Sequence, residues 1–173
     1  MRSDAMLLEN SVKNAYDEST NGKRSGDTVA ELECIREYIL AAREIVVPNR
    51  NDLKITAINK VLEEFGLAEA KHLRCDTTSC DMSRMPSITK ALMGLDISRC
   101  DLVIARGRLG IPGSGSMLVI MDSKGRILTA GLSPSHVIHG KPVEEAVRDE
   151  CTTALERVGF QLRGKTRDIY ERT

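Results

Sequence analysis

The sequence has no tryptophan and few aromatic residues of any kind, which make up 3% of the chain. Proteins that hold single-stranded nucleic acid stack its bases on such side chains, so this class of function is not expected. An excess of positive charge is also lacking, because 25 Lys and Arg residues balance 25 Asp and Glu residues. Without a basic surface to attract phosphate backbones, we expect no nucleic-acid partner.

Long apolar runs are lacking too. No stretch reaches the roughly 18 apolar residues that a membrane span requires, and residues 1–20 show no signal-peptide pattern. We therefore expect a soluble, cytoplasmic protein with no membrane partner. The length of 173 residues favours one globular domain, 1–173, with a partly mobile N-terminal segment, 1–27, and an exposed tail, 164–173.

The cysteines form no metal-binding pattern. There are five of them, an odd number scattered along the chain. Cys75 and Cys80 are four residues apart, but no second pair or nearby histidine completes a tetrahedral zinc site. We interpret all five as reduced thiols.

Apolar spacing predicts strands that alternate with helices. Helices are expected at 28–40, where Thr28 and Glu31 form a capping-box pattern, at 53–65 after an Asp52 N-cap, at 87–95 and at 143–158. Strands are expected at 44–48, 70–75, 101–105, 117–121 and 127–132, and loops at 17–28, 76–86 and 133–142. The last two strands should form a hairpin. This order predicts an α/β fold, a mixed sheet flanked by helices.

The strongest functional signal is the glycine-serine segment 106–116, RGRLGIPGSGS, between two apolar strands. Glycines such as Gly113 and Gly115 let backbone N–H groups approach a phosphate closely, and the hydroxyls of Ser114 and Ser116 add donors. Arg106 and Arg108 offer bidentate contacts to the same oxygens. The alternative is a connection that needs glycine only for flexibility.

The second signal is the strand-turn-helix segment 47–54, VPNRNDLK. Arg50 and Lys54 bring positive charge to the start of a helix, where free N–H groups favour anions. Asn49 or Asn51 can bind a base, ribose or phosphate. Asparagine also caps helices for purely structural reasons, and that reading stays open.

The third signal is the segment 132–139, LSPSHVIH. Ser133 and Ser135 offer hydroxyls to a phosphate, although both are also common turn residues. Of the two histidines, His136 is the better candidate for moving a proton. The glycine-flanked nucleophile of a serine hydrolase is missing.

Acidic side chains in this chain offer ligands for Mg²⁺, which accompanies nucleoside triphosphates and needs only one or two protein carboxylates. The candidates are Asp76 and Asp101, with Asp81 and Glu150 as further possibilities. Their spacing does not require a metal.

Residues 47–59, VPNRNDLKITAIN, resemble the inosine/xanthosine triphosphate pyrophosphatase superfamily. The resemblance implies that Asn49 or Asn51 and Lys54 hold the triphosphate. Those enzymes carry metal-binding, water-activating acids on the helix after the second strand. The corresponding segment here, 87–95, has no acid, which favours an organic acceptor over water.

A longer resemblance runs from Glu44 to Phe160, through ARGRLGIPGSGSMLVIMD at 105–122 and LSPSHVIH at 132–139. These segments resemble the HcgB family, methanogen guanylyltransferases that help to make the iron-guanylylpyridinol cofactor of [Fe]-hydrogenase. The resemblance implies an ITPase-like fold, a homodimer, and transfer of GMP from GTP to a pyridinol hydroxyl with release of pyrophosphate.

From the residues themselves, we expect a magnesium-dependent site in which Arg50, Lys54, Arg106 and Arg108 hold the triphosphate and His136 accepts the hydroxyl proton. Two alternatives stay open: a pyrophosphatase acting on non-standard purine nucleotides, and a non-catalytic nucleotide carrier. Every version requires the glycine-serine segment and the Asn-Arg-Asn turn to meet in space.

Overall fold

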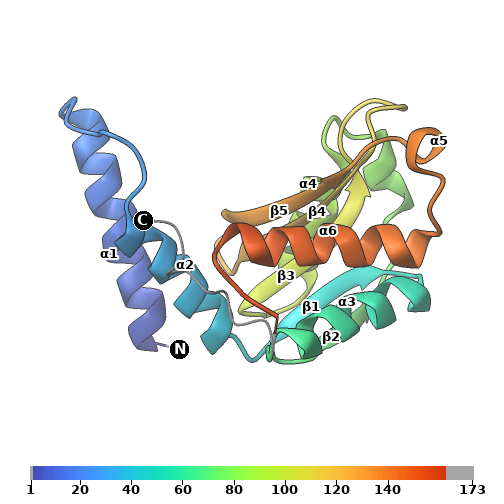
Figure 1. Ribbon diagram of the computed structural model, residues 1–173, viewed down its shortest axis with the longest axis horizontal. Helices are drawn as coiled ribbons and strands as arrows, with labels where there is room; N and C mark the ends of the chain where they lie inside the picture. The colour runs from blue at the N-terminus through green and yellow to red at the C-terminus, as the bar shows by residue number, and fades with distance from the viewer. Residues whose placement is uncertain (1, 163–173) are drawn as a thin grey trace, which may run out of the picture.

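The computed structural model describes residues 2–162, which form a five-stranded mixed sheet with helices on both faces (Figure 1). The strands follow the spatial order β2-β1-β3-β4-β5. β1 pairs in parallel with β2 and β3, whereas β4 pairs antiparallel with β3 and β5. The predicted α/β fold class and the hairpin of the last two strands are confirmed. The strands are β1 Ile45–Asn49, β2 Ala70–Arg74, β3 Leu102–Arg108, β4 Ser116–Asp122 and β5 Ile127–Ser133.

The helices divide into two layers and a separate hairpin. α3 and α6 pack against each other on one face of the sheet, and α4 covers the other face. α1 and α2 stand together beside the sheet (Figure 1). The helices are α1 Arg2–Thr20, α2 Val29–Ala41, α3 Asp52–Glu64, α4 Pro86–Ile97, α5 His136–His139 and α6 Val143–Arg157, with a 3-10 helix, η1, at Thr78–Met82.

The sheet is buried on both sides because its central strands alternate between two apolar cores. On β3, Leu102 and Ile104 face the core shared with α3 and α6, whereas Val103 and Ala105 face α4. Successive side chains of a strand point to opposite faces of the sheet. A strand that has helices packed on both faces is therefore a continuous apolar run in the sequence. This explains why the sequence marks these strands so clearly.

Several local predictions are wrong in detail. The expected loop at 17–28 begins only after Thr20, because α1 extends that far. The loops expected at 76–86 and 133–142 each contain a short helix, η1 and α5. α3 is capped by Asn51 rather than Asp52, since the Asn51 side chain accepts a hydrogen bond from the backbone N–H of Leu53 at 2.9 Å. The predicted tail, 164–173, lies outside the described residues.

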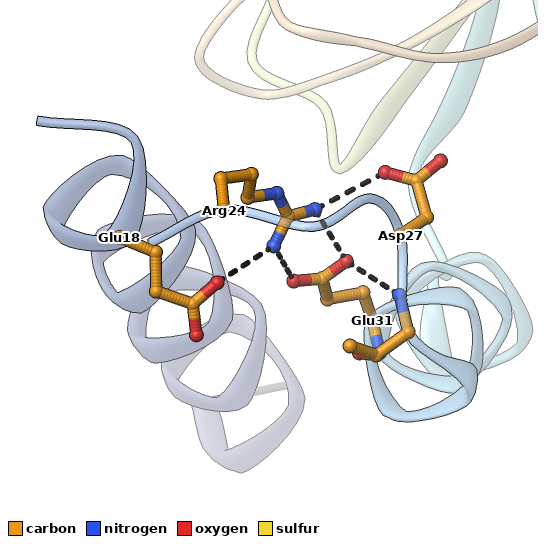
Figure 2. Close-up of polar contacts among 5 residues, drawn as sticks. Glu18, Arg24, Asp27 and Glu31 are labelled. Carbon is orange, nitrogen blue, oxygen red and sulfur yellow. Dashed lines mark hydrogen bonds and ion pairs between the residues drawn. The ribbon is translucent and has the colours of Figure 1, made fainter. Parts of the chain in front are cut away.

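Arg24 fastens α1 to α2 (Figure 2). Its guanidinium contacts the carboxylates of Glu18 at 3.2 Å and Asp27 at 3.1 Å, and it forms a two-pronged pair with Glu31. Glu31 also completes the capping box predicted at Thr28. Hydrogen bonds from Arg24 and from the backbone of Thr28 lower the pKa of Glu31 to about 2.

We expect the α1–α2 contact to loosen in acid. Because the pKa of Glu31 is lower in the folded chain than its ordinary 4.5, its contribution is complete above pH 4.5 and is lost as the pH falls toward 2. Arg24→Gln should produce the same loosening at neutral pH, seen as faster amide hydrogen exchange in the last turns of α1. The neighbouring exposed Lys23→Gln is the control, and equal exchange in both variants would contradict this role of Arg24.

Among residues 2–162, no helix is both long and apolar enough to cross a membrane.

Candidate active site

A polar pocket of about 310 Å³ lies where β3 ends and α3 begins. In parallel α/β sheets, ligands bind outside the carboxyl ends of the strands, which is where this pocket opens. Its walls come from α3, α4, β3, the β3–β4 connection, β4 and the segment that includes α5. The lining residues are Lys54, Lys90, Arg106, Gly107, Arg108, Gly113, Gly115, Ser116, Pro134, Ser135, His136 and His139.

The glycine-serine segment forms a tight loop that closes on itself. Gly113 and Gly115 have φ of 96° and 91°, a backbone conformation that other residues rarely adopt. A Cβ on Gly115 would lie 2.2 Å from the carbonyl oxygen of Ser133, so the close approach to β5 also requires glycine. The Ser114 hydroxyl accepts a hydrogen bond from the N–H of Gly110 at 2.9 Å, within the loop and away from the pocket lining.

The Arg108 side chain connects this loop to η1. Its Nε donates to the carbonyl oxygen of Gly110 at 2.8 Å, and its Nη2 donates to the carbonyl oxygen of Asp81. Both acceptors are neutral, so the positive charge of Arg108 has no carboxylate partner among the described residues. It stays available to an anion in the pocket.

Arg106 is paired with a buried acid behind the pocket. Its Nε lies 3.0 Å from Oε1 of Glu150, a residue of α6 with no exposed surface. Ser116 and Ser133, both predicted to bind phosphate, instead contact the same carboxylate through their hydroxyls, at 3.1 and 2.9 Å. Ser116 still lines the pocket, whereas Ser133 does not.

Lys54 enters the pocket from the first turn of α3. Its ammonium group has no ion-pair or hydrogen-bond partner among the described residues. Burial, followed by the positive charges of Arg106 and Lys90, lowers its pKa from the ordinary 10.5. An unpaired, partly buried lysine among other cations is costly unless an anion joins it, so this group indicates where a ligand's negative charge belongs.

Lys90 is a pocket residue that the sequence analysis missed. It lies on the inner face of α4, is 8% exposed, and pairs with Asp81 at 3.0 Å. α4 lies close to β3 here, since a Cβ on Gly107 would come within 2.9 Å of the backbone nitrogen of Ser87. The sequence does contain a signal for this residue, namely a lysine on the apolar side of the expected helix, between Ser87 and Ala91.

The segment after β5 adds two histidines. His136 and His139 form an edge-to-face ring pair with centroids 5.7 Å apart. Nδ1 of His139 accepts a hydrogen bond from the N–H of Lys141 at 2.8 Å, which fixes that ring. The ring of His136 makes no hydrogen bond within the described part of the chain, so its nitrogens are open to a ligand in the pocket. Ser135 lines the same wall.

The side chains of the Asn-Arg-Asn turn do not line the pocket. Asn49 accepts a hydrogen bond from the N–H of Asn51 and contacts the His72 ring, and Asn51 caps α3. Arg50 is exposed and pairs with Asp76 at 3.3 Å. Contrary to expectation, the Asn-Arg-Asn turn therefore does not join the glycine-serine segment in the pocket lining. Of the segment 47–54, only Lys54 lines the pocket.

The two acids predicted to bind magnesium, Asp76 and Asp101, do not line the pocket. Asp101 accepts hydrogen bonds from the N–H groups of Arg43 and Glu44, at the start of β3 and about 20 Å from the pocket by strand length. Asp76 accepts a hydrogen bond from the N–H of Thr78, which lowers the pKa of Asp76. Within residues 2–162, no group of three His, Cys, Asp or Glu side chains is placed to hold a metal ion.

The pocket is thus positively charged and suited to a polyanion. Glu150 and Asp81 each neutralise one cation, which leaves Lys54 and Arg108 uncompensated. A family model described as "FeGP cofactor biosynthesis protein HcgB, guanylyltransferase" matches residues 8–160. The chain belongs to this family. As an HcgB-family guanylyltransferase of FeGP cofactor biosynthesis, it acts on a nucleotide, in agreement with the charge of the pocket.

Proposed function

We propose that the protein transfers GMP from GTP to the hydroxyl of a pyridinol, with release of pyrophosphate. The observation that carries this proposal is the cationic pocket, in which Lys54 and Arg108 lack carboxylate partners among the described residues. A triphosphate supplies the missing negative charge, and membership of the HcgB family supplies the type of reaction.

The reaction is a displacement at the α-phosphorus. The acceptor oxygen forms a bond to phosphorus while the bond to the pyrophosphate oxygen breaks, and the hydroxyl proton passes to the ring of His136. Lys54, Arg106 and Arg108 stabilise the charge that develops on the phosphate oxygens and on the departing pyrophosphate. Catalysis here consists mainly of positioning and charge neutralisation.

The carboxylates beside the pocket favour an organic acceptor over water. Asp81 pairs with Lys90 and Glu150 with Arg106, so neither is a free base that can activate water. α4 is three residues longer than predicted, by Pro86 at its start and by two residues at its end. It therefore includes an acid, Asp96, but this side chain is exposed in the last turn and does not line the pocket. This donor set does not fit a magnesium ion held by the protein within the pocket. We propose that Mg²⁺ arrives as part of the GTP complex.

The assay combines GTP, Mg²⁺ and a pyridinol acceptor and measures pyrophosphate. We expect pyrophosphate only when the acceptor is present, with one guanylylated product for each pyrophosphate. Rapid release from inosine or xanthosine triphosphate without acceptor would identify a pyrophosphatase. Tight nucleotide binding without turnover would identify a carrier.

We infer that two copies pair through the exposed apolar side of the α1–α2 hairpin. α1 packs mainly on α2, and apolar residues of both helices remain exposed, including Tyr16 at 66% and Val29 at 74%. Between the helices lies a largely apolar hollow of about 500 Å³. Burial of such a face is the main driving force of stable dimers.

A charge on this face should therefore separate the copies. Tyr16→Glu, at an exposed position of α1 that lines this hollow, is expected to shift the molar mass from dimer to monomer in size-exclusion chromatography with light scattering. Ile127→Glu, at a similarly exposed apolar position on β5, is the control and should leave the dimer intact. A wild-type chain that is monomeric at micromolar concentration would contradict the inference.

A further inference from the structure

Glu150 is a fully buried carboxylate directly behind the pocket. It belongs to α6, but the groups that it contacts belong to β3, β4 and β5. A buried carboxylate is tolerated only when it is paired and fully hydrogen-bonded. Glu150 meets this condition entirely through residues at the pocket end of three strands.

The contacts of Glu150 fix one edge of the Arg106 guanidinium. Nε of Arg106 lies 3.0 and 3.3 Å from the two carboxylate oxygens, and Nη2 lies 3.1 Å from Oε2. Nη2 also donates to the hydroxyl of Ser116 at 2.9 Å. The hydroxyls of Ser116 and Ser133 both contact Oε2, which holds the carboxylate itself in place.

The opposite edge of Arg106 is left open. Its Nη1 has no hydrogen-bond partner among the described residues, and Arg106 lines the pocket. Because a guanidinium is planar and rigid, fixing Nε and Nη2 also fixes the direction in which Nη1 donates. Gly131 on β5 lets α6 approach closely enough to bury Glu150, because a Cβ at Gly131 would come within 1.9 Å of the Glu150 carbonyl oxygen.

We propose that Glu150 is a positioning residue for guanylyl transfer, which holds Arg106 so that Nη1 points at the phosphate being transferred. This inference rests on the proposed function. Glu150 itself does not touch the substrate, and it does not line the pocket. A preorganised donor gains its catalytic effect from having its direction fixed before the reaction.

Glu150→Gln separates positioning from charge. The substitution removes a negative charge beside an anion pocket, so the affinity for inorganic pyrophosphate, measured by calorimetry, should be unchanged or higher. The kcat of transfer should nevertheless fall by about 10-fold to 100-fold, because the direction of Nη1 is no longer fixed. A pyrophosphate affinity that is kept or increased, together with slower transfer, is not expected from a residue that only supports the fold.

Asp122→Asn is the matched control. Asp122 is also a buried acid, 1% exposed, which pairs with Arg126 at 2.7 Å at the other end of β4. This variant should lose stability but keep the kcat and the pyrophosphate affinity. If Glu150→Gln does not fold, Ser133→Ala decides, because it removes one contact of Glu150 and should lower kcat by a few-fold.

Unchanged kcat in folded Glu150→Gln, or in Ser133→Ala where that variant decides, would overturn the inference while leaving the proposed function intact. A wild-type chain that shows no acceptor-dependent transfer would refute the proposed function, and the inference with it.

Discussion

Replacing Lys54 by methionine is expected to lower kcat/KM for GTP by about 100-fold to 1,000-fold, the range found when one preorganised donor to a developing oxyanion is removed. Lys54 carries an uncompensated charge in the pocket, so its loss removes attraction for both the bound triphosphate and the transition state. Lys60→Met, also on α3 but at an exposed position outside the pocket, is the control. Equal losses in both variants would show that Lys54 acts only through net charge.

The lowered pKa of Lys54 also predicts how nucleotide affinity depends on pH. Burial disfavours the charged ammonium, whereas a bound phosphate favours it, so at a pH near the lowered pKa nucleotide binding takes up a proton. Affinity should therefore decline as the pH rises through the lowered pKa, which lies below 10.5. In Lys54→Arg the guanidinium stays charged, and this part of the decline should disappear. Comparing the two proteins cancels the titration of the nucleotide itself.

Replacing Gly131 by alanine should be the most damaging small substitution in the sheet. The added Cβ would lie 1.9 Å from the carbonyl oxygen of Glu150 and 2.9 Å from its Cα, so α6 must move away from β5. We expect a loss of about 3 kcal/mol or more in the free energy of unfolding, measured in urea. The displaced α6 would also carry Glu150 away from Arg106, and transfer should be lost.

Gly110→Ala is the matched control for this substitution. A Cβ at Gly110 meets nothing closer than 3.8 Å, and its φ is not positive. Its unfolding free energy should stay within about 1 kcal/mol of the wild type. A similar stability for the two variants would mean that α6 and β5 are not in backbone contact.

The sequence predicted the sheet well because its strands carry their own signal. β1, β3 and β4 are buried on both faces, so each is a short apolar run that needs no partner to be recognised. α1 was missed although Leu8, Val12 and Ala15 repeat at helical spacing, because its polar composition resembles that of an N-terminal extension. η1 and α5 are too short to show any period.

The pocket was predicted in part for a similar reason. The glycine-serine segment and Lys54 are recognisable from local sequence, and both reach the pocket. The side chains at 49–51 could not be placed, because His72 on β2 and the start of α3 supply their partners. Lys90 and Glu150 come from helices whose distance from the pocket depends on Gly107 and Gly131, a packing detail that no local pattern reveals.

The central claim is that the phosphates of GTP lie in the pocket formed by Lys54, Arg106 and Arg108. A crystal structure with GTP bound tests it most directly. We expect phosphate oxygens within hydrogen-bond distance, about 3 Å, of the Lys54 ammonium and of Nη1 of Arg106. Phosphates bound instead in the hollow between α3 and α6, beside Lys60 and Arg148, would contradict the account.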